Sequence, residues 1–534
     1  MTLNVIDCTL RDGGYYNDWD FSYELINDYL LAMAEAGVDY VELGFRTFES
    51  NGFKGACAYT TDEFIQTLKI PTGLKLGVML NASELVKHQK GPVEASKLLI
   101  KPFDNSPVTL VRLACHYHEF EETLPVCEWL KREGYTVGIN LMQIAERTEL
   151  EINMVAKWAK KTDLDVLYFA DSMGSLDAEQ TARIVGNFRQ NWAGSLGVHM
   201  HDNMGQALSN TLRAIKVGVT WLDSTVTGMG RGPGNLQTEY LLAELASQEI
   251  RKTNLTQLLG LIRKYFSPMK SHYGWGTNTY YYLAGKYGIH PTYVQEMLSD
   301  SRYSDEDILS VINHLRAEGG KKFSFNNLVA GRAFFHGNLK GTWAPKSFMH
   351  DREVLILASG PGVAKHRAAL ESYVNTRKPY VIALNANEVI GNELIDARAA
   401  CHPVRLLADC KLYEALPHPL ICPASMLPED VKIGLAGTEL FDYGIQVVEG
   451  EFQFGESSCT VPTGLVIAYA LALAAGGGAK SIVIAGMDGY DADDPRNLEL
   501  DSILSLYSKT KNSVPIKAIT PSRLRLPKGS VYQL

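Results

Sequence analysis

The chain has 534 residues, which is too many for one ordinary hydrophobic core, so its length predicts two or three domains. Hydrophobic residues make up 46% of the sequence and charged residues 21%, a composition typical of a soluble globular protein. The net charge of -9 argues against a general nucleic-acid binder, because neutralising phosphates requires clustered Lys and Arg.

The cysteines and the most apolar stretch exclude two further classes. Eight cysteines are scattered without a C-x-x-C spacing, which indicates reduced thiols in a cytoplasmic protein and not a disulfide framework or a zinc finger. The stretch GLVIAYALALAAGGGA (464–479) is too short to span a bilayer and ends in glycines. We therefore expect a buried helix there and no membrane partner.

The first 240 residues alternate short apolar runs with longer helical patterns. The runs are rich in Val, Leu, Ile and Tyr and nearly continuous in apolarity, as expected of strands buried on both faces. They cover 3–7, 38–45, 74–80, 108–115, 135–142, 165–172, 195–202 and 219–228. Eight strand–helix units in this length predict a (β/α)₈ TIM barrel, with a doubly wound open sheet as the alternative.

The pattern changes after the predicted barrel. Residues 241–350 read as helices around an aromatic cluster, which predicts a helical extension, and residues 351–534 restart an α/β pattern. Runs at 353–362, 379–387, 404–410, 419–425 and 481–490 predict the strands of a doubly wound, Rossmann-like α/β domain. The predicted domains are thus 1–240, 241–350 and 351–534.

Polar side chains follow the predicted barrel strands, at the end where TIM barrels carry their active sites. They concentrate at one edge of the predicted barrel. They are Arg11, Asp12, Glu42, Arg46, Arg112, His116, His118, Asn140, Asp171, Ser172, His199, His201, Asp202, Asn203 and Asn235.

The spacing of two histidines on the seventh strand predicts a metal site. Residues two apart on a strand point to the same face, so His199 and His201 are expected to project inward together. Two imidazoles and a carboxylate suit a divalent transition metal. Asp12 can supply the carboxylate, because strand 1 neighbours strand 8 in a closed barrel and strand 8 neighbours strand 7. The alternative is a pair of hydrogen-bonded interior histidines.

A glycine-rich segment, GMGRGPGN, follows the eighth strand and ends at Asn235. Its four glycines permit backbone conformations that other residues disfavour and let the chain pass close to a ligand. It lacks the Lys-Ser/Thr ending of a phosphate-binding P-loop. A tight turn and a ligand contact therefore both fit the segment, and the amide oxygen of Asn235 could join the metal ligands.

Four motifs in this order carry a family resemblance: TLRDG after strand 1, ADSMG after strand 6, HMHDNMG at strand 7 and GMGRGPGN after strand 8. Together they resemble the metal-dependent TIM-barrel aldolases, lyases and acyl-condensing synthases, a family that includes 4-hydroxy-2-oxovalerate aldolase, hydroxymethylglutaryl-CoA lyase and isopropylmalate synthase. The resemblance covers about residues 1–300.

The resemblance implies roles for the motif residues. Asp12, His199 and His201 would bind Mn²⁺ or Mg²⁺, and Arg11 would stabilise an enolate oxygen. Ser172 would help to hold the substrate carboxylate. To the same substrate site we assign Asn140 and Glu42, which end their own strands.

One position departs from the family pattern. The hydroxy-oxovalerate aldolases carry a histidine base four residues after the arginine, where this chain has Tyr15. A phenol ordinarily titrates near pH 10, so a tyrosine acts more readily as an acid or a hydrogen-bond donor than as a base. His116 and His118 are substitute candidates for the base. The segment GGYYN also lacks the pattern of the Claisen-type synthases, which favours an aldolase.

The C-terminal domain more weakly resembles sialyltransferase-like and pterin pyrophosphokinase-like nucleotide-binding domains, through LILASGPG and AKSIVIAGMDGYD. This resemblance implies a nucleotide there, and a purely structural α/β domain is the alternative. The fused domain suggests that the product is a 2-oxo-3-deoxy sugar acid for surface polysaccharide.

The prediction is therefore a carbon–carbon lyase: a divalent-metal-dependent aldolase that joins or cleaves pyruvate, or a similar 2-oxo acid, and an aldehyde. One rival is an acyl-CoA-dependent synthase or lyase of the same superfamily. Another is a non-catalytic barrel that serves as a scaffold for a nucleotide- or sugar-binding C-terminal domain. By analogy with the family, we expect a homodimer.

Overall fold

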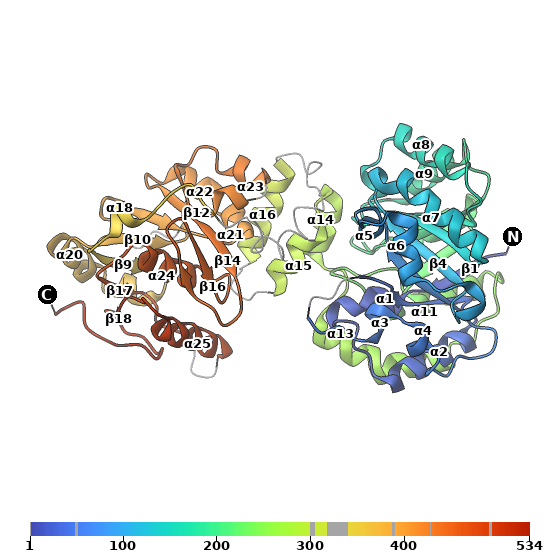
Figure 1. Cartoon of the computed structure of the whole chain (residues 1–534), viewed down its shortest axis with the longest axis horizontal. Coiled ribbons are helices and arrows are strands. Elements are labelled where there is room, and N and C mark those ends of the chain that lie inside the picture. Colours follow the sequence, from blue (N-terminus) through green and yellow to red (C-terminus); the bar gives the residue numbers. More distant parts are fainter. Residues whose placement is uncertain are drawn as a thin grey trace. The chain divides into compact units, whose positions relative to one another are not determined.

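The computed structural model describes residues 2–48, 52–299, 305–317, 340–386, 390–427, 429–490 and 494–533. The chain forms two compact units, Met1–Ser299 and Asp300–Leu534. Figure 1 shows the first unit in blue to green and the second in yellow to red. The predicted three-part division at 240 and 350 stays a prediction, and the helices of 241–350 are divided between the two units.

Parallel strands of the first unit close into a barrel in chain order, from β1 to β8 and back to β1, within the described residues. This confirms the predicted TIM barrel. The strands are β1 (Asn4–Asp7), β2 (Tyr40–Phe45), β3 (Lys75–Asn81), β4 (Leu110–Cys115), β5 (Thr136–Leu141), β6 (Val166–Asp171), β7 (Ser195–Met200) and β8 (Trp221–Ser224). The barrel closes because β1 pairs with β8 as well as with β2, with Val5 opposite Leu222.

Helices surround the barrel and shield the outward-facing side chains of its strands. They are α2 (Tyr23–Ala36), α3 (Ala56–Tyr59), α4 (Asp62–Ile65), α5 (Ala82–Val86), α6 (Pro92–Leu99), α7 (Phe120–Glu133), α8 (Glu149–Ala159), α9 (Ala178–Arg189), α10 (Ala207–Lys216) and α11 (Thr238–Ser247). Local sequence signals set their limits. Helix α2 begins where the Ser22 hydroxyl accepts a hydrogen bond from the Leu25 amide, and it ends at Gly37, whose φ is +83°.

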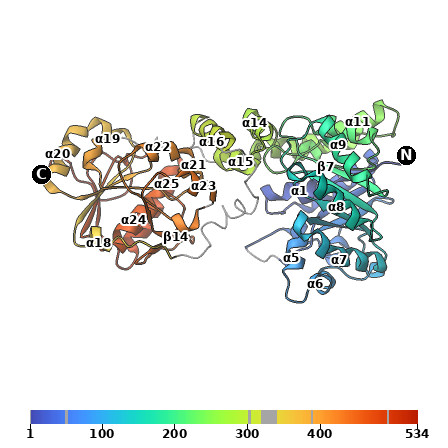
Figure 2. The same ribbon diagram turned by 90° about the horizontal axis from the view of Figure 1, so that it is seen from above.

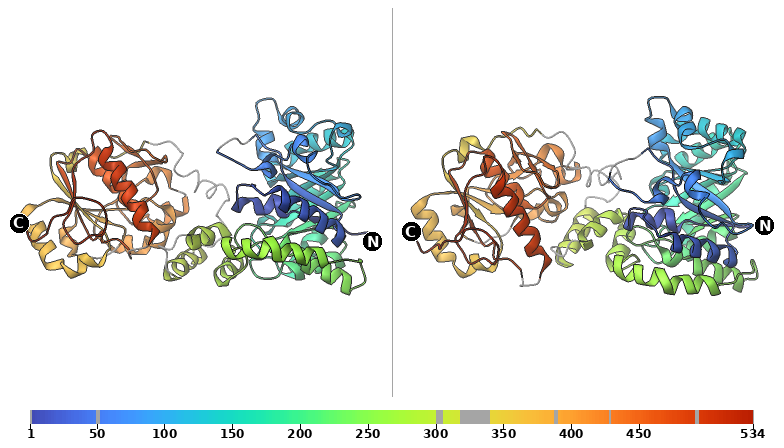
Figure 3. Two further views of the ribbon diagram at one scale, coloured as in Figure 1. Left: turned by 90° about the horizontal axis from the view of Figure 1, so that it is seen from below. Right: turned by 60° about the horizontal axis from the view of Figure 1, so that its bottom comes forward.

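Further helices of the first unit pack on the barrel. They are α12 (Thr256–Leu261), α13 (Ser267–Tyr273), α14 (Thr279–Tyr287) and α15 (Pro291–Ser299). Helix α12 lies beside α2, and Figure 3 shows this green segment running along the dark blue one. Just beyond α12, Lys264 forms ion pairs with Glu24 and Asp28 of α2.

The second unit is built on a parallel sheet of strand order β13-β12-β11-β10-β9-β17-β18 in the described chain. These strands are β9 (Glu353–Leu357), β10 (Tyr380–Leu384), β11 (Ala397–Ala399), β12 (Leu420–Cys422), β13 (Leu440–Asp442), β17 (Ser481–Ala485) and β18 (Ile516–Ala518). Strands β14 (Gly444–Val447), β15 (Gln453–Phe454) and β16 (Ser458–Val461) form a smaller sheet. The order reverses beside β9, as in doubly wound folds, which confirms the predicted fold class.

Helices of this unit pack on the larger sheet or on one another. They are α16 (Asp305–Ala317), α18 (Lys346–Met349), α19 (Pro361–Lys365), α20 (Arg367–Arg377), α21 (Pro403–Ala408), α22 (Cys410–Ala415), α23 (Glu429–Gly434), α24 (Val466–Gly476) and α25 (Pro495–Lys509). Figure 2 shows α20 and α24 on opposite sides of the sheet. Leu370 of α20 packs with Leu355 and Leu357 of β9, and α24 lies against β10.

The prediction of a strand at 404–410 is wrong, because this segment forms α21 and the start of α22. Pro403 sits at the first position of α21, where its missing N–H and fixed φ favour a helix. The apolar stretch 464–479 contains the buried helix α24, as predicted. No helix among the described residues is long and apolar enough to cross a membrane. All eight cysteines are buried free thiols.

Candidate active site

The loop after β1 carries Arg11 and Asp12 into the barrel. Residues Thr9–Gly13 form the short helix α1. The Asp7 carboxylate at the end of β1 accepts a hydrogen bond from the Thr9 amide at 2.9 Å, which ends the strand and starts the helix. The Val226 amide then donates to the Thr9 hydroxyl at 2.7 Å, which ties this helix to the segment after β8.

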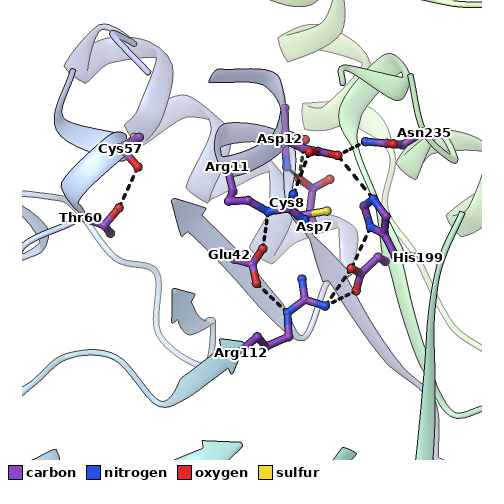
Figure 4. A network of polar contacts seen from close by, with 12 residues as sticks. Asp7, Cys8, Arg11, Asp12, Glu42, Cys57, Thr60, Arg112, His199 and Asn235 are labelled. Atoms are coloured by element: carbon purple, nitrogen blue, oxygen red, sulfur yellow. Dashed lines mark hydrogen bonds and ion pairs between the residues drawn. The ribbon is translucent and has the colours of Figure 1, made fainter. Parts of the chain in front are cut away.

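Arg11 and Asp12 lie in a network of alternating charges at the carboxyl end of the barrel. Arg11 donates from Nη1 to Asp12 Oδ1 and from Nε to Glu42 Oε1, both at 2.7 Å. Arg112 of β4 donates from Nε to the other Glu42 oxygen at 2.6 Å. Figure 4 shows these side chains pointing toward one another. Glu42 thus fixes two guanidinium groups with its two oxygens.

Asp223 of β8 closes the network on the other side. Arg112 Nη1 reaches both Asp223 oxygens, at 2.9 and 2.8 Å, and Asp223 Oδ2 lies 3.0 Å from Nδ1 of His199. His199 Nε2 in turn lies 3.5 Å from Asp12 Oδ2. With Nδ1 held by a carboxylate, the His199 ring presents Nε2 to Asp12, which is how metal-binding histidines are commonly oriented.

The three predicted metal ligands converge. One ligand atom from each of Asp12, His199 and His201 lies within 4.8 Å of the others. The two imidazole rings lie 5.3 Å apart between centroids. His201 Nδ1 is buried and has no hydrogen-bond partner within the described structure. An unpartnered buried nitrogen beside a carboxylate and a second imidazole fits the coordination of a divalent cation.

The charges in the network also fit a cation. Two guanidinium groups face three buried carboxylates, Asp12, Glu42 and Asp223, which leaves one negative charge to be balanced. Burial alone would lower the pKa of His199, but its hydrogen bonds with Asp12 and Asp223 raise this pKa, so a protonated His199 balances that charge, and a bound cation would take its place. Burial alone would raise the pKa of Asp12, but the Arg11 charge and the His199 hydrogen bond hold this pKa well below its usual range. Burial, and then the neighbouring His199, lower the pKa of His201 to about 3, so its ring is a neutral ligand.

A second group, Cys8, His199 and Asp223, also brings three ligand atoms together. Asp223 is already held by both of its oxygens to Arg112. The Cys8 thiol lies 3.4 Å from the Ser224 carbonyl oxygen, and burial raises its pKa to about 11, which disfavours a thiolate ligand. The group with Asp12 is therefore the better cation site.

The segment after β8 fastens Asn235 to the ligands. Asn235 pairs with His201 as an antiparallel bridge, and its side-chain amide donates to Asp12 Oδ2. Gly234 has a φ of +74°, and a Cβ there would lie 2.2 Å from the Gly228 carbonyl oxygen. Two of the glycines are thus required for the backbone to fold back and deliver Asn235. Its Oδ1 is buried without a hydrogen-bond partner in the described chain.

The remaining predicted site residues lie at the ends of their strands. Asn140 is buried in β5, and its Oδ1 has no hydrogen-bond partner among the described residues. The Ser172 hydroxyl accepts from the Gln143 amide at 3.0 Å. Tyr15 lies in the turn Gly14–Tyr16 and packs edge-on against Trp19. His116 follows β4 and stacks on His118. Their assigned roles stay predictions.

Two members of the network had no role predicted from the sequence: Arg112 was placed at this end of the barrel without one, and Asp223 was not named. Each is a single charged residue inside an apolar run, LVRLAC in β4 and WLDS in β8. Charged residues are rarely fully buried unless they are paired, so each run signalled a buried partner of opposite charge. The sequence did not show that Arg112 and Asp223 pair with each other.

Comparison with known proteins assigns the barrel to a family. The sequence model of the HMGL-like family matches residues 116–263. A solved structure of the N-terminal domain of a presumed aldolase from Bacteroides vulgatus is 32% identical, with a TM-score of 0.51 over 56% of this chain and 98% of that domain. The chain belongs to the HMGL-like family.

Curated relatives of this HMGL-like chain are carbon–carbon lyases. An oxaloacetate decarboxylase of Mycobacterium tuberculosis is 27% identical over 45% of this chain and 69% of its own length. The 4-hydroxy-2-oxovalerate aldolase 4 of Rhodococcus opacus is 28% identical over 45% of this chain and 67% of its own length. The chain is accordingly a carbon–carbon lyase of the aldolase and lyase type. The resemblance of the second unit to nucleotide-binding domains stays a prediction.

Proposed function

We propose that the first unit joins or cleaves the bond between C3 of pyruvate, or of a similar 2-oxo acid, and the carbonyl carbon of an aldehyde. The observation that carries this proposal is the convergence of Asp12, His199 and His201 with Arg11 beside them at the carboxyl end of the barrel. These three residues would hold Mn²⁺ or Mg²⁺. A cation bound there supplies Lewis-acid polarisation of a 2-oxo group.

Arg11 supplies fixed positive charge where the enolate oxygen of the 2-oxo acid develops. Its guanidinium is already clamped by Asp12 and Glu42, so it need not reorganise during the reaction. The His199 ring is held in one tautomer by Asp223. The site is thus preorganised before the substrate arrives.

The other predicted residues would orient the substrates. Ser172 uses its hydroxyl oxygen as an acceptor, which leaves the hydroxyl hydrogen to donate to the substrate carboxylate. Asn140 presents a buried amide. Tyr15 would donate a hydrogen bond to the aldehyde oxygen. The resemblance of the second unit to sialyltransferase-like domains motivates our further proposal that the product is a 2-oxo-3-deoxy sugar acid for surface polysaccharide.

Exchange of the C3 protons of pyruvate with D₂O, followed by NMR in the presence of Mg²⁺, tests the enolate-forming step without any aldehyde. We expect metal-dependent exchange by the purified full chain. Asp12→Ala and His199→Ala should abolish it, whereas His272→Ala, which changes an exposed histidine of α13 with no assigned role, should not. Exchange that persists in the first two variants would reject the proposal.

Oxaloacetate decarboxylation is a second candidate, because a decarboxylase of that substrate is among the relatives. Loss of carbon dioxide from oxaloacetate and loss of an aldehyde from an aldol both leave the enolate of pyruvate, so the same residues serve either reaction. Release of pyruvate from oxaloacetate, compared with release from 4-hydroxy-2-oxo acids, separates the two.

A further inference from the structure

Arg231 lies beside the metal ligands but outside the charge network of Arg11, Asp12, Glu42, Arg112, Asp223 and His199. Its guanidinium stands over the Tyr15 ring, 4.2 Å from the centroid. Tyr15 follows Asp12 by three residues on the loop after β1. Arg231 itself belongs to the segment after β8, so its contact with Tyr15 joins the loop that carries Asp12 to the segment that carries Asn235.

The backbone fixes this position. The Gly234 amide donates to the Arg231 carbonyl at 3.1 Å, and the Asp202 amide donates to the Gly234 carbonyl at 2.9 Å. Asp202 adjoins His201, and Asn235 adjoins Gly234 and donates to Asp12. The turn that carries Arg231 is therefore fastened at one end to two of the metal ligands.

Residues after the barrel hold the other side of this turn. The Gly276 amide donates to the Gly232 carbonyl at 3.0 Å, and a Cβ at Gly232 would lie 3.1 Å from the ring of Tyr281. His290, at the start of α15, is buried, and its pKa is lowered to about 3 by burial and then by the Arg231 charge. Arg231 thus lies near the aromatic side chains Tyr15 and Tyr281 and the neutral ring of His290.

Arg11 and Arg231 differ in burial and in what they contact. Arg11 is buried and clamped by two carboxylates beside the metal ligands, where a three-carbon 2-oxo acid would react. Arg231 is partly exposed and lies over the Tyr15 ring. We expect the second substrate to approach the enolate from this more exposed side of the site.

Resting on the proposed function, we infer that Arg231 is a specificity-determining residue that binds an anionic group, a carboxylate or a phosphate, on the aldehyde substrate. A guanidinium suits either anion, because its donors match the spacing of carboxylate and phosphate oxygens. Stacking on Tyr15 keeps the guanidinium plane in place while its edge contacts the anion. The aldehyde class is therefore an acidic aldehyde or an aldehyde phosphate.

The test compares kcat/KM for matched aldehydes with pyruvate and Mg²⁺, using the full chain. One pair is glyceraldehyde 3-phosphate and glyceraldehyde, and the other is succinic semialdehyde and butanal. We expect the wild type to prefer the anionic member of at least one pair by roughly tenfold to a hundredfold, the effect of one charge-assisted contact. The pair that shows the preference identifies the anion as a phosphate or a carboxylate.

Variants assign the preference to Arg231. Arg231→Gln should reduce it to less than about threefold, and Arg231→Lys, which keeps the charge, should retain part of it. Arg213→Gln, in α10 and paired with Glu179, is the matched control and should retain all of it. If Arg231→Gln does not fold, the wild-type preference is measured against KCl concentration, and an ionic contact predicts that it shrinks as salt rises.

A wild type without an anionic preference, or a preference that Arg231→Gln or high salt leaves intact, overturns this inference. The proposed function is judged separately by pyruvate proton exchange in the wild type. Exchange without anionic preference leaves the proposed function in place and removes the role of Arg231. Absence of exchange removes both.

Discussion

At the scale of single residues, Asp223 controls how His199 faces the cation site. Replacing it with Asn removes the negative charge that holds the His199 ring and one of the two carboxylates on Arg112. Loss of such an outer partner commonly lowers metal affinity about tenfold to a hundredfold. We expect a loss of this size for Mn²⁺, measured by competition with a chelator.

The matched control for this prediction is Glu42→Gln. It removes the other carboxylate on Arg112 but leaves the contact between Asp223 and His199. Both variants should unfold at a lower temperature than the wild type, because each leaves the buried Arg112 with one carboxylate partner fewer. Equal Mn²⁺ affinities in Asp223→Asn and wild type would contradict the proposed orientation of His199.

Asp171, at the end of β6, gives a prediction about pH. Burial raises its pKa to about 6, although the amides of Leu176 and Ser175 donate to its carboxylate. Since the folded pKa lies above the unfolded value near 4, the protonated acid is favoured by folding, and this stability is lost as pH rises from about 4 to about 6. The loss is on the order of 3 kcal/mol.

The check is the difference in melting temperature between Asp171→Asn and the wild type, measured from pH 4.5 to 7.5. The amide cannot ionise, so the variant should gain stability relative to the wild type as pH rises and level off above about pH 7. A difference that does not vary with pH would contradict the raised pKa.

The convergence of Asp12, His199 and His201 could be predicted from the sequence, because residue type and spacing carried that information. His199 and His201 were expected to lie together because residues two apart on a strand share a face. Asp12 was expected beside them because the first strand of a closed barrel pairs with the last. The roles of Asp223, Arg112 and Arg231 could be assigned only from the coordinates. These roles depend on which side chains from different strands and loops meet, and spacing along the chain does not encode that.

At the scale of elements, the segment from Gly228 to Asn235 is a bent loop whose glycines set the position of the Asn235 amide beside Asp12. Gly234→Ala places a Cβ 2.2 Å from the Gly228 carbonyl at a positive φ. We expect a stability loss of about 1–3 kcal/mol and a larger loss of pyruvate proton exchange, because Asn235 moves away from Asp12. Thermal unfolding and the exchange rate provide the two measurements.

Gly260→Ala in α12 is the control, because a Cβ there meets no atom within 4 Å. Alanine is the better helix former, so this change should stabilise the protein slightly, by about 0.5–1 kcal/mol. A Gly234→Ala variant that behaves like Gly260→Ala would show that the bend tolerates a side chain and that the loop has another role.

Element prediction from the sequence was reliable for the barrel and less so for the second unit. Barrel strands are buried on both faces, so their continuous apolar runs stood out from the amphipathic helices between them. The run at 404–410 has a similar apolar content, but Pro403 and the His402 that precedes it start the helix α21. Short apolar segments are ambiguous between strand and helix until such end signals are weighed.

At the scale of the whole molecule, the first unit contains every residue of the proposed site. We predict that a chain of residues 1–299 folds alone and binds Mn²⁺ as the full chain does. The matched domain from Bacteroides vulgatus, which this chain covers over 98% of its length, was solved as a separate N-terminal domain. Circular dichroism and Mn²⁺ titration of the shortened chain test this. Aggregation, or loss of metal binding, would show that the second unit is needed.

The most direct test of the cation site is anomalous diffraction from crystals of the full chain soaked with Mn²⁺ and pyruvate. We predict a manganese peak at bonding distance from a carboxylate oxygen of Asp12 and from one ring nitrogen each of His199 and His201, with pyruvate alongside Arg11. A peak between Cys8 and Asp223, or no peak near these residues in metal-saturated crystals, would contradict the account.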